Sequence, residues 1–267
     1  MKTSPVDRMD SGFVRTDLLA VAASLSLVLV LVLSMGNTTR TATESAACQN
    51  NFKQLSQAWL KHSADNPLLV GNPGGGAAMT GNPTREDAWA FGWLTWDGAS
   101  DNTNTAKLQT VTFAPYIGSD VSVFRCPSDR FVTETQRGRG WRSRVRSYSM
   151  NGHIRPVGDG PFASGYRVFT RESDFQFPSH TFVFTDEHPD SINDPWFYAY
   201  PDGSRIVDVP ASFHNRGAGF SFADGHVELH RWRGPQFVKP VRFSFSFGSG
   251  TNDVDLLWLG QRASQRR

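Results

Sequence analysis

Hydrophobic residues are concentrated near the start of this chain. Residues 18–39 carry no charged side chain, and residues 25–33 are almost entirely Leu and Val. A helix over 18–39 would be about 33 Å long at 1.5 Å per residue, close to the roughly 30 Å hydrocarbon thickness of a bilayer. The pattern therefore predicts a transmembrane helix over residues 18–39, because Leu and Val favour insertion.

A cleaved secretory leader is the alternative for this segment, because Lys2 and Arg8 precede it and small residues follow it at 45–47. However, the apolar block exceeds the about 7 to 15 residues typical of such leaders, and the small residues lie beyond a polar stretch. We therefore favour the membrane helix. The basic residues before it predict a cytoplasmic N-terminus and an exported C-terminal domain.

Helical spacing continues beyond the apolar block. Phe52, Leu55, Trp59 and Leu60 recur at intervals of three and four residues, with polar residues between them. This periodicity predicts one helix over 13–65 whose second half turns an apolar stripe toward a core. After it the chain is rich in Gly, Pro and Asn, which predicts long loops.

The later part of the chain alternates in the manner of β-strands. Apolar and polar residues alternate over 219–222 and 226–230, and Asp224-Gly225 between them forms a tight turn, so we expect a β-hairpin. Strand composition also occurs at 147–152, 181–185 and 243–247. These patterns predict an α+β protein in which the helix packs on a small antiparallel β-sheet, within a globular domain over 66–260 followed by a frayed tail at 261–267.

Composition and charge exclude several classes of protein. The chain has 20 Phe and 8 Trp, which excludes a disordered protein. The chain has 27 Lys and Arg against 25 Asp and Glu. The resulting net charge of +2 is too small to imply a nucleic acid or another polyanion as a partner. The arginines between 137 and 146 have few aromatic residues among them, so we expect a solvated or filament-contacting loop and no nucleic-acid partner. The two cysteines, Cys48 and Cys126, allow one disulfide or two buried free thiols.

An acidic turn follows the strand predicted at 181–185. Its carboxylates, Asp186, Glu187, Asp190 and Asp194, are oxygen donors of the kind that calcium prefers, although their spacing differs from that of an EF-hand loop. The same residues commonly form turns by bonding their own backbone, and we favour that interpretation. We therefore expect no resident cofactor, with calcium at this turn as the alternative.

Two other arrangements resemble chemical sites. The histidines and glutamate at 226, 228 and 230 share one strand face at about 6.6 Å spacing, which suits zinc binding by adjacent pairs only. His214 with Asp186 or Asp224 and a serine has the composition of a hydrolase triad, but the chain has no Gly-x-Ser-x-Gly element. We expect no enzymatic activity.

Residues 11–19 resemble the class III leader of type IV prepilins and pseudopilins, in which a short basic leader ends in Gly and the mature chain begins with Phe. The resemblance implies that a prepilin peptidase removes leader 1–12 after Gly12 and that Phe13 is N-methylated. It also implies an assembly role for Asp17, which stands where the family carries Glu. Arg15 departs from the family, which has an aliphatic residue there.

Later segments are similar to a large group of pseudopilin-like proteins named for a His, nine residues and Asp-Gly. They are Cys48-Gln-Asn-Asn-Phe-Lys-Gln-Leu, Cys126-Pro-Ser-Asp, residues 147–152, the acidic turn, and His214 followed nine residues later by Asp224-Gly225. The resemblance implies that His214, Asp224 and Gly225 are structural. In an export-facing compartment we expect a disulfide between Cys48 and Cys126.

The resemblance implies a pilin-like fold and a structural function. The expected protein is a membrane-anchored subunit of a type II secretion or type IV pilus-like assembly, with other pseudopilin subunits, a prepilin peptidase and the lipid bilayer as partners. It would cross a bacterial inner membrane once, with a cytoplasmic N-terminus and a periplasmic C-terminal domain. The alternative is a membrane-tethered periplasmic domain that binds a glycan or a cation, through the Trp-rich segment 89–96 or the acidic turn, with no filament role.

Overall fold

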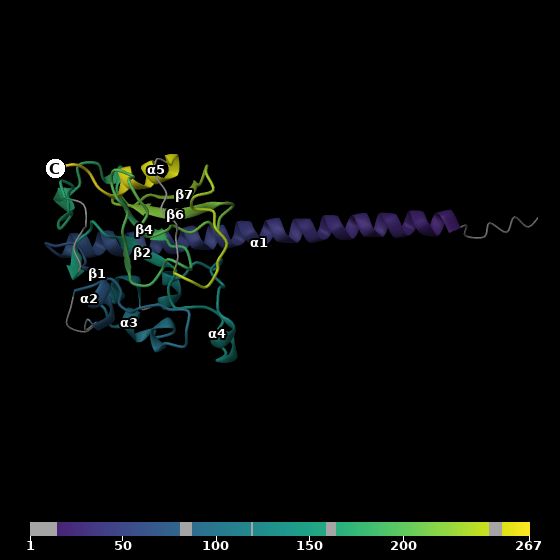
Figure 1. Cartoon of the computed structure of the whole chain (residues 1–267), viewed down its shortest axis with the longest axis horizontal. Helices are drawn as coiled ribbons and strands as arrows, with labels where there is room; N and C mark the ends of the chain where they lie inside the picture. Colours follow the sequence, from purple (N-terminus) through teal and green to yellow (C-terminus); the bar gives the residue numbers. More distant parts are fainter. Residues whose placement is uncertain (1–14, 81–86, 119, 159–163, 246–252) are drawn as a thin grey trace, which may run out of the picture. The chain divides into compact units, whose positions relative to one another are not determined.

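The computed structural model describes residues 15–80, 87–118, 120–158, 164–245 and 253–267, with the backbone alone over 15–17 and 31–40 (Figure 1). The predicted cleavage residues Gly12 and Phe13, and the side chain of Asp17, lie outside the described residues. The chain forms two compact units, Met1–Thr43 and Glu44–Arg267.

Helices and strands alternate irregularly along the second unit. The helices are α1 (Arg15–Asp65), α2 (Gly75–Thr80), α3 (Ala106–Gln109), α4 (Glu134–Gly138) and α5 (Val254–Ala263). The strands are β1 (Asn72–Gly74), β2 (Tyr148–Asn151), β3 (Pro156–Gly158), β4 (Phe182–Asp186), β5 (Trp196–Phe197), β6 (Gly217–Phe222) and β7 (Val227–Arg231). Short 3-10 helices lie at Ser100–Asn102, Ala114–Ile117, Val121–Phe124, Glu172–Asp174 and Pro178–His180.

The N-terminal helix α1 ends at Asp65, where the periodicity of the sequence also ends it. In the second unit its side chains Phe52, Leu55 and Trp59 are fully buried in the main core. In the first unit, the described Leu and Val side chains of residues 18–30 are exposed. The two parts of α1 therefore present apolar surface to different surroundings.

No helix among the described residues is both long enough and apolar enough to cross a membrane. The predicted transmembrane first half over 18–39 is therefore wrong for the part of the chain that the structure describes. The single-pass placement in a bacterial inner membrane, with its cytoplasmic and periplasmic sides, depended on that span and is wrong for the same reason.

A five-stranded sheet in the order β5-β2-β4-β6-β7 forms the centre of the second unit (Figure 1). The pairs β2–β4, β4–β6 and β6–β7 are antiparallel, whereas β5 is parallel to β2. The sheet is therefore mixed, and the prediction of an antiparallel sheet is wrong in this respect. The chain reverses direction between β4 and β5, so β5 regains the direction of β2. A separate pair, β1 and β3, is also parallel.

The sheet is covered on both faces. On one face Phe52 of α1 packs with Tyr148 and Phe184 in the main core. On the other face Leu256 and Leu259 of α5 pack with Phe220 in a second core. Every residue of β6 is buried, because successive side chains of a strand point to opposite faces and both faces are occupied.

The hairpin predicted from the Asp-Gly turn is present. Strand β6 pairs with β7 from Gly217 opposite Arg231 to Ser221 opposite Val227. Gly225 has a φ of +93°, a left-handed conformation that glycine adopts without steric cost. The local turn signal therefore gave the correct pairing.

The C-terminal segment differs from the expected strand and tail. Residues 243–245, the described part of the strand predicted at 243–247, form no strand. Helix α5 continues to Ala263, and the Ser264 hydroxyl donates to the Arg167 carbonyl at 2.7 Å. The segment 261–267 is thus packed on the second unit and not frayed, because these hydrogen bonds attach it.

Candidate metal centre

Four side chains from separate segments converge at one buried point of the second unit. Cys48 belongs to α1, Cys126 follows the 3-10 helix Val121–Phe124, Asp186 ends β4, and His214 lies in the loop that leads to β6. The first three have no exposed surface, and His214 is 5% exposed. Among the described residues they form the one group of three or more His, Cys, Asp or Glu side chains able to hold a metal ion together.

The donor atoms of this cluster all lie within 4.8 Å of one another. His214 Nε2 is 3.3 Å from Asp186 Oδ2 and 3.4 Å from Cys126 Sγ. Cys48 Sγ is 3.7 Å from Asp186 Oδ2. Two soft sulfur donors, one imidazole nitrogen and one carboxylate oxygen therefore surround a common point.

Each of three donor side chains is oriented by a further hydrogen bond. The backbone N–H of Gly219 donates to Asp186 Oδ1 at 2.8 Å. The pairing of β4 with β6 brings these two groups together. His214 Nδ1 is 3.0 Å from the Ser45 hydroxyl, and Cys48 Sγ is 3.2 Å from the Tyr148 hydroxyl. Such outer contacts fix the orientation of the atoms that face the cluster.

Burial and mutual contact shift the pKa values in this cluster. Burial raises the pKa of the Cys48 thiol well above its usual value, and contacts with Cys126 and Asp186 raise it further. Burial alone would raise the pKa of Cys126, but hydrogen bonds with Cys48 and His214 lower it overall. Burial alone would lower the pKa of His214, but hydrogen bonds with Asp186 and Cys126 raise it overall. Without an ion, negative charge is thus favoured at Cys126 and positive charge at His214.

The cluster contains the components of a Cys-His-Asp triad but not its geometry. In such a triad the two ring nitrogens of the histidine serve different partners, one the nucleophile and the other the carboxylate. Here Cys126 and Asp186 both approach Nε2 of His214, and Nδ1 faces Ser45. The cysteines are also fully buried, so a substrate has no access to them.

The predicted pairing of Cys48 with Cys126 is only partly correct. The structure brings the two sulfurs into one cluster, but it holds both residues as free thiols and not as a disulfide. The alternative of two buried thiols describes them better. The two sulfurs also contact each other, since a hydrogen bond with Cys48 helps to lower the pKa of Cys126.

The acidic turn supplies only one carboxylate to the cluster. Asp190 accepts hydrogen bonds from the backbone N–H groups of Arg242 and Ser244, and Asp194 accepts them from Gly75 and Trp196. Glu187 accepts from the hydroxyl of Ser191. Among the described residues, Asp186, Glu187, Asp190 and Asp194 therefore do not gather into one group of carboxylates. The bond of Asp194 with the Trp196 N–H is of the local turn type, whereas Asp190 bonds a distant segment of the chain.

His214 and the Asp224-Gly225 pair lie in two places. His214 joins the buried cluster, whereas Asp224 lies in the hairpin turn 2.6 Å from Nδ1 of His226. His230 stacks on Trp258 with ring centroids 3.6 Å apart, so the histidines at 226 and 230 do not converge on a metal. A structural role for Asp224 and Gly225 in the turn agrees with this geometry.

The arginine cluster includes a buried network that sequence reasoning missed. Arg144 and Arg146 are each 1% exposed. Arg146 donates to the Tyr148 carbonyl at 2.8 Å, and the guanidinium of Arg144 lies 3.9 Å from the ring centre of Trp96. Burial lowers the pKa of Arg146 to about 10, although the nearby Glu187 opposes that shift. Both arginines thus donate to backbone carbonyls inside the protein, Arg144 to that of Pro189 and Arg146 to that of Tyr148, and the alternating Arg pattern gave no sign of it.

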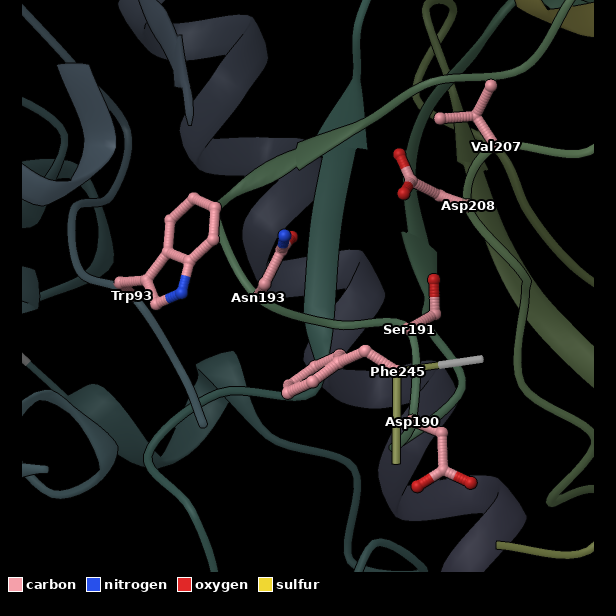
Figure 2. Close-up of a pocket in the computed structure, with 7 residues that line it drawn as sticks. All are labelled: Trp93, Asp190, Ser191, Asn193, Val207, Asp208 and Phe245. Atoms are coloured by element: carbon pink, nitrogen blue, oxygen red, sulfur yellow. The ribbon is translucent and has the colours of Figure 1, made fainter. Parts of the chain in front are cut away.

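A surface pocket of about 350 Å³ lies beside the acidic turn (Figure 2). It is lined by Trp93, Asp190, Ser191, Asn193, Val207, Asp208 and Phe245. The other aromatic residues of the Trp-rich segment differ in their role, since Trp89 and Phe91 are buried in the main core. Trp93 is therefore the ring of this segment that borders the pocket.

No family model, curated protein or solved structure matches this chain. The chemistry of its own residues therefore carries the argument about function.

Proposed function

We propose that this protein is a structural, pseudopilin-like subunit of a type II secretion-like or type IV pilus-like assembly, whose copies associate through the first part of α1. The observation that carries the proposal is the exposed apolar surface of residues 18–30. The resemblance of residues 11–19 to a prepilin leader supports it independently.

The apolar surface in question consists of Leu and Val side chains that are 49–70% exposed. They are Leu18, Leu19, Val21, Leu25, Leu27, Val28, Leu29 and Val30. Full burial of one such side chain contributes about 1.5–3 kcal/mol, whereas association costs about 4–15 kcal/mol. Because these side chains are 49–70% exposed, covering all eight with helices of other copies would contribute about 6–17 kcal/mol, which is of the order of that cost.

The polar side chains within this stretch need no outside partner. The hydroxyl of Ser24 donates to the Ala20 carbonyl at 2.7 Å, and that of Ser26 donates to the Ala22 carbonyl at 2.8 Å. Burying a hydroxyl is costly only when it lacks a hydrogen bond. The whole described surface of 18–30 is thus suited to burial between helices.

Sedimentation velocity of the full-length chain in aqueous buffer tests this proposal. We expect the unmodified chain to form large species whose proportion rises with concentration. The double variant Leu25→Glu/Leu29→Glu, which places two charges on one helix face, is expected to shift the distribution toward the monomer. The matched control is Asn50→Glu/Gln57→Glu, which adds the same charge to exposed positions of α1 in the second unit.

Circular dichroism at the same concentration verifies that both variants keep their helices. The proposal predicts that the control assembles as the unmodified chain does. The proposal would be refuted if the unmodified chain remained monomeric at all concentrations. Equal loss of assembly in the control would also refute it, because the apolar face would then have no specific role.

A second candidate function, glycan binding, is favoured by the pocket. Trp93 offers an indole ring with the amide of Asn193 near it, and Asp208 offers a carboxylate at another part of the pocket wall (Figure 2). Aromatic rings with polar neighbours suit the apolar faces and hydroxyls of sugars. Calorimetric titration with neutral oligosaccharides tests glycan binding. The candidate function is supported if the unmodified chain gives heat of binding and Trp93→Ala abolishes it. The control Phe177→Ala, at an exposed site outside the pocket, should leave that heat intact.

A further inference from the structure

We propose that Cys48, Cys126, Asp186 and His214 bind one zinc ion in tetrahedral coordination. The proposal is independent of filament assembly, because all four residues belong to the second unit. It assigns a single role to side chains that sequence reasoning divided between a disulfide and a structural histidine.

The spacing of the donor atoms agrees with zinc. Bonds of about 2.3 Å to sulfur and about 2.0–2.1 Å to nitrogen and oxygen, at tetrahedral angles, put nitrogen and oxygen about 3.3 Å apart and put sulfur about 3.5 Å from either. The structure has 3.3 Å between His214 Nε2 and Asp186 Oδ2, 3.4 Å between Cys126 Sγ and Nε2, and 3.7 Å between Cys48 Sγ and Oδ2. The three separations agree with this coordination to within about 0.2 Å.

The arrangement around His214 favours a central ion over a chain of hydrogen bonds. Nε2 carries at most one proton and can donate it to one partner at a time. Nevertheless Cys126 and Asp186 both approach Nε2, while Nδ1 is already engaged by Ser45. An ion at the common point gives each of these atoms its own bond.

With zinc bound, the charges of the buried cluster balance to within one unit. On binding, the thiols and Nε2 of His214 lose their protons to solvent, and the imidazole coordinates through Nε2 in its neutral form. Two thiolates and one carboxylate then share the 2+ charge of the ion, which leaves one net negative charge. The Tyr148 hydroxyl beside Cys48 and the backbone N–H of Gly219 on Asp186 provide hydrogen bonds to two of these anionic ligands.

The donor set discriminates between metals. Thiolates are poor ligands for calcium and magnesium, whereas two sulfurs with one nitrogen and one oxygen at tetrahedral spacing suit zinc. Because all four ligands come from the protein and are buried, this is a closed, structural site. It would connect α1, the Cys126 loop, the end of β4 and the loop before β6.

Elemental analysis of the reduced full-length chain tests the proposal. The chain is unfolded with thiol reductant, refolded with zinc sulfate, and dialysed, because a buried site fills as the protein folds. We expect about one zinc per chain. Refolding with cobalt instead should give a thiolate-to-cobalt charge-transfer absorption in the near ultraviolet, which only sulfur ligation produces.

In the variants Cys48→Ser and Cys126→Ser, the zinc content per chain should fall at least tenfold, and the cobalt charge-transfer band should disappear. The matched control is His226→Asn, which removes an exposed histidine paired with Asp224 and should retain both signals. Tryptophan fluorescence reports whether each variant is folded. A chelator should lower the urea midpoint of the unmodified chain and leave the midpoint of folded cysteine variants unchanged.

Two results would overturn the proposal without any variant. One is an unmodified, reduced chain that regains its native fluorescence but binds no zinc. The other is a chain in which mass measurement shows a disulfide between Cys48 and Cys126 that reforms in the presence of zinc. Retention of zinc by folded cysteine variants would overturn it as well.

Discussion

Replacement of Gly219 by Ala tests how closely α1 approaches the sheet. Gly219 lies in β6 beneath the ring of Phe52, and an added methyl group would be 2.3 Å from one ring carbon and 2.8 Å from another. Phe52 is fully buried, and its ring centroid lies 4.4 Å from that of Tyr148, so it has little room to move away. We therefore expect the variant to be destabilised.

The expected magnitude follows from two opposing effects. Inserting a methyl group into a packed core costs about 1–3 kcal/mol, and the short distances put Gly219→Ala at the upper end of that range. Ala is more favourable than Gly within a strand by about 0.5–1 kcal/mol. The net loss in the free energy of unfolding should therefore be about 2 kcal/mol.

Urea unfolding followed by tryptophan fluorescence measures this loss, at one protein concentration because association changes apparent stability. The control is Gly76→Ala in α2, where a methyl group meets nothing within 4 Å, and there we expect no loss. In a Phe52→Leu background the Gly219→Ala change should cost about 1 kcal/mol less, because the clashing ring is gone. Equal losses in both backgrounds, or no loss in either, would refute the close contact.

Two further predictions concern buried charges in the second unit. Burial lowers the pKa of His153 to about 4, against 6.5 for an unperturbed histidine, so its neutral form contributes stability that is present above pH 6.5 and lost as the pH falls toward 4. This loss in the free energy of unfolding amounts to about 3 kcal/mol. Between pH 7 and pH 4, the free energy of unfolding measured in urea should therefore fall less for His153→Phe than for the unmodified chain. An equal fall would show that His153 is not the cause. Arg146→Met should cost about 3 kcal/mol, because it removes the buried hydrogen bonds that the guanidinium donates to the Tyr148 carbonyl at 2.8 Å and to the Ser149 hydroxyl at 3.0 Å. If urea unfolding finds Arg146→Met as stable as the unmodified chain, the buried Arg146 does not contribute to stability as expected.

Local signals in the sequence were sufficient for several elements. The hairpin of β6 and β7 follows from alternation around Asp224-Gly225, because an Asp-Gly turn fixes both the reversal and its register. The second part of α1 follows from the spacing of Phe52, Leu55 and Trp59. Each of these signals is local, because it involves residues that are close together in the sequence.

Features that depend on distant segments were not predictable in the same way. Strand β5 is only Trp196–Phe197, and its parallel pairing with β2 depends on how the acidic turn reverses the chain. The buried role of Arg144 and Arg146 depends on carboxylates about 40 residues later, so the local pattern indicated only a basic loop. The apolar block at 18–39 gave a strong local signal that the described part of the helix does not bear out.

The candidate metal centre shows the same limit. Pairing of Cys48 with Cys126, and of His214 with Asp186, was each considered from sequence alone. Their union was not, because the four ligands lie far apart along the chain and no short spacing motif joins them. Only the packing of α1 against β4 and β6 brings these two pairs to one point.

The contacts around this centre indicate how α1 is fastened to the second unit. Glu44 pairs with Arg130 and accepts a hydrogen bond from Ser128, and the Asn51 amide donates to the Arg125 carbonyl at 2.9 Å. Cys48 lies between Glu44 and Asn51 on the helix, at intervals of four and three residues, so all three side chains share one helix face. That face meets the segment 125–130, which also contains Cys126.

An exposed ion pair and a hydrogen bond each contribute only about 0.5–1.5 kcal/mol, so these contacts hold the helix weakly by themselves. Zinc shared by Cys48 and Cys126 would place a much stronger link in the middle of the same helix face, because metal ligation adds directly to the free energy of folding. Cys48 lies near the start of the part of α1 that belongs to the second unit, which begins at Glu44. A metal link at Cys48 therefore lies where it best resists detachment of the helix from the sheet.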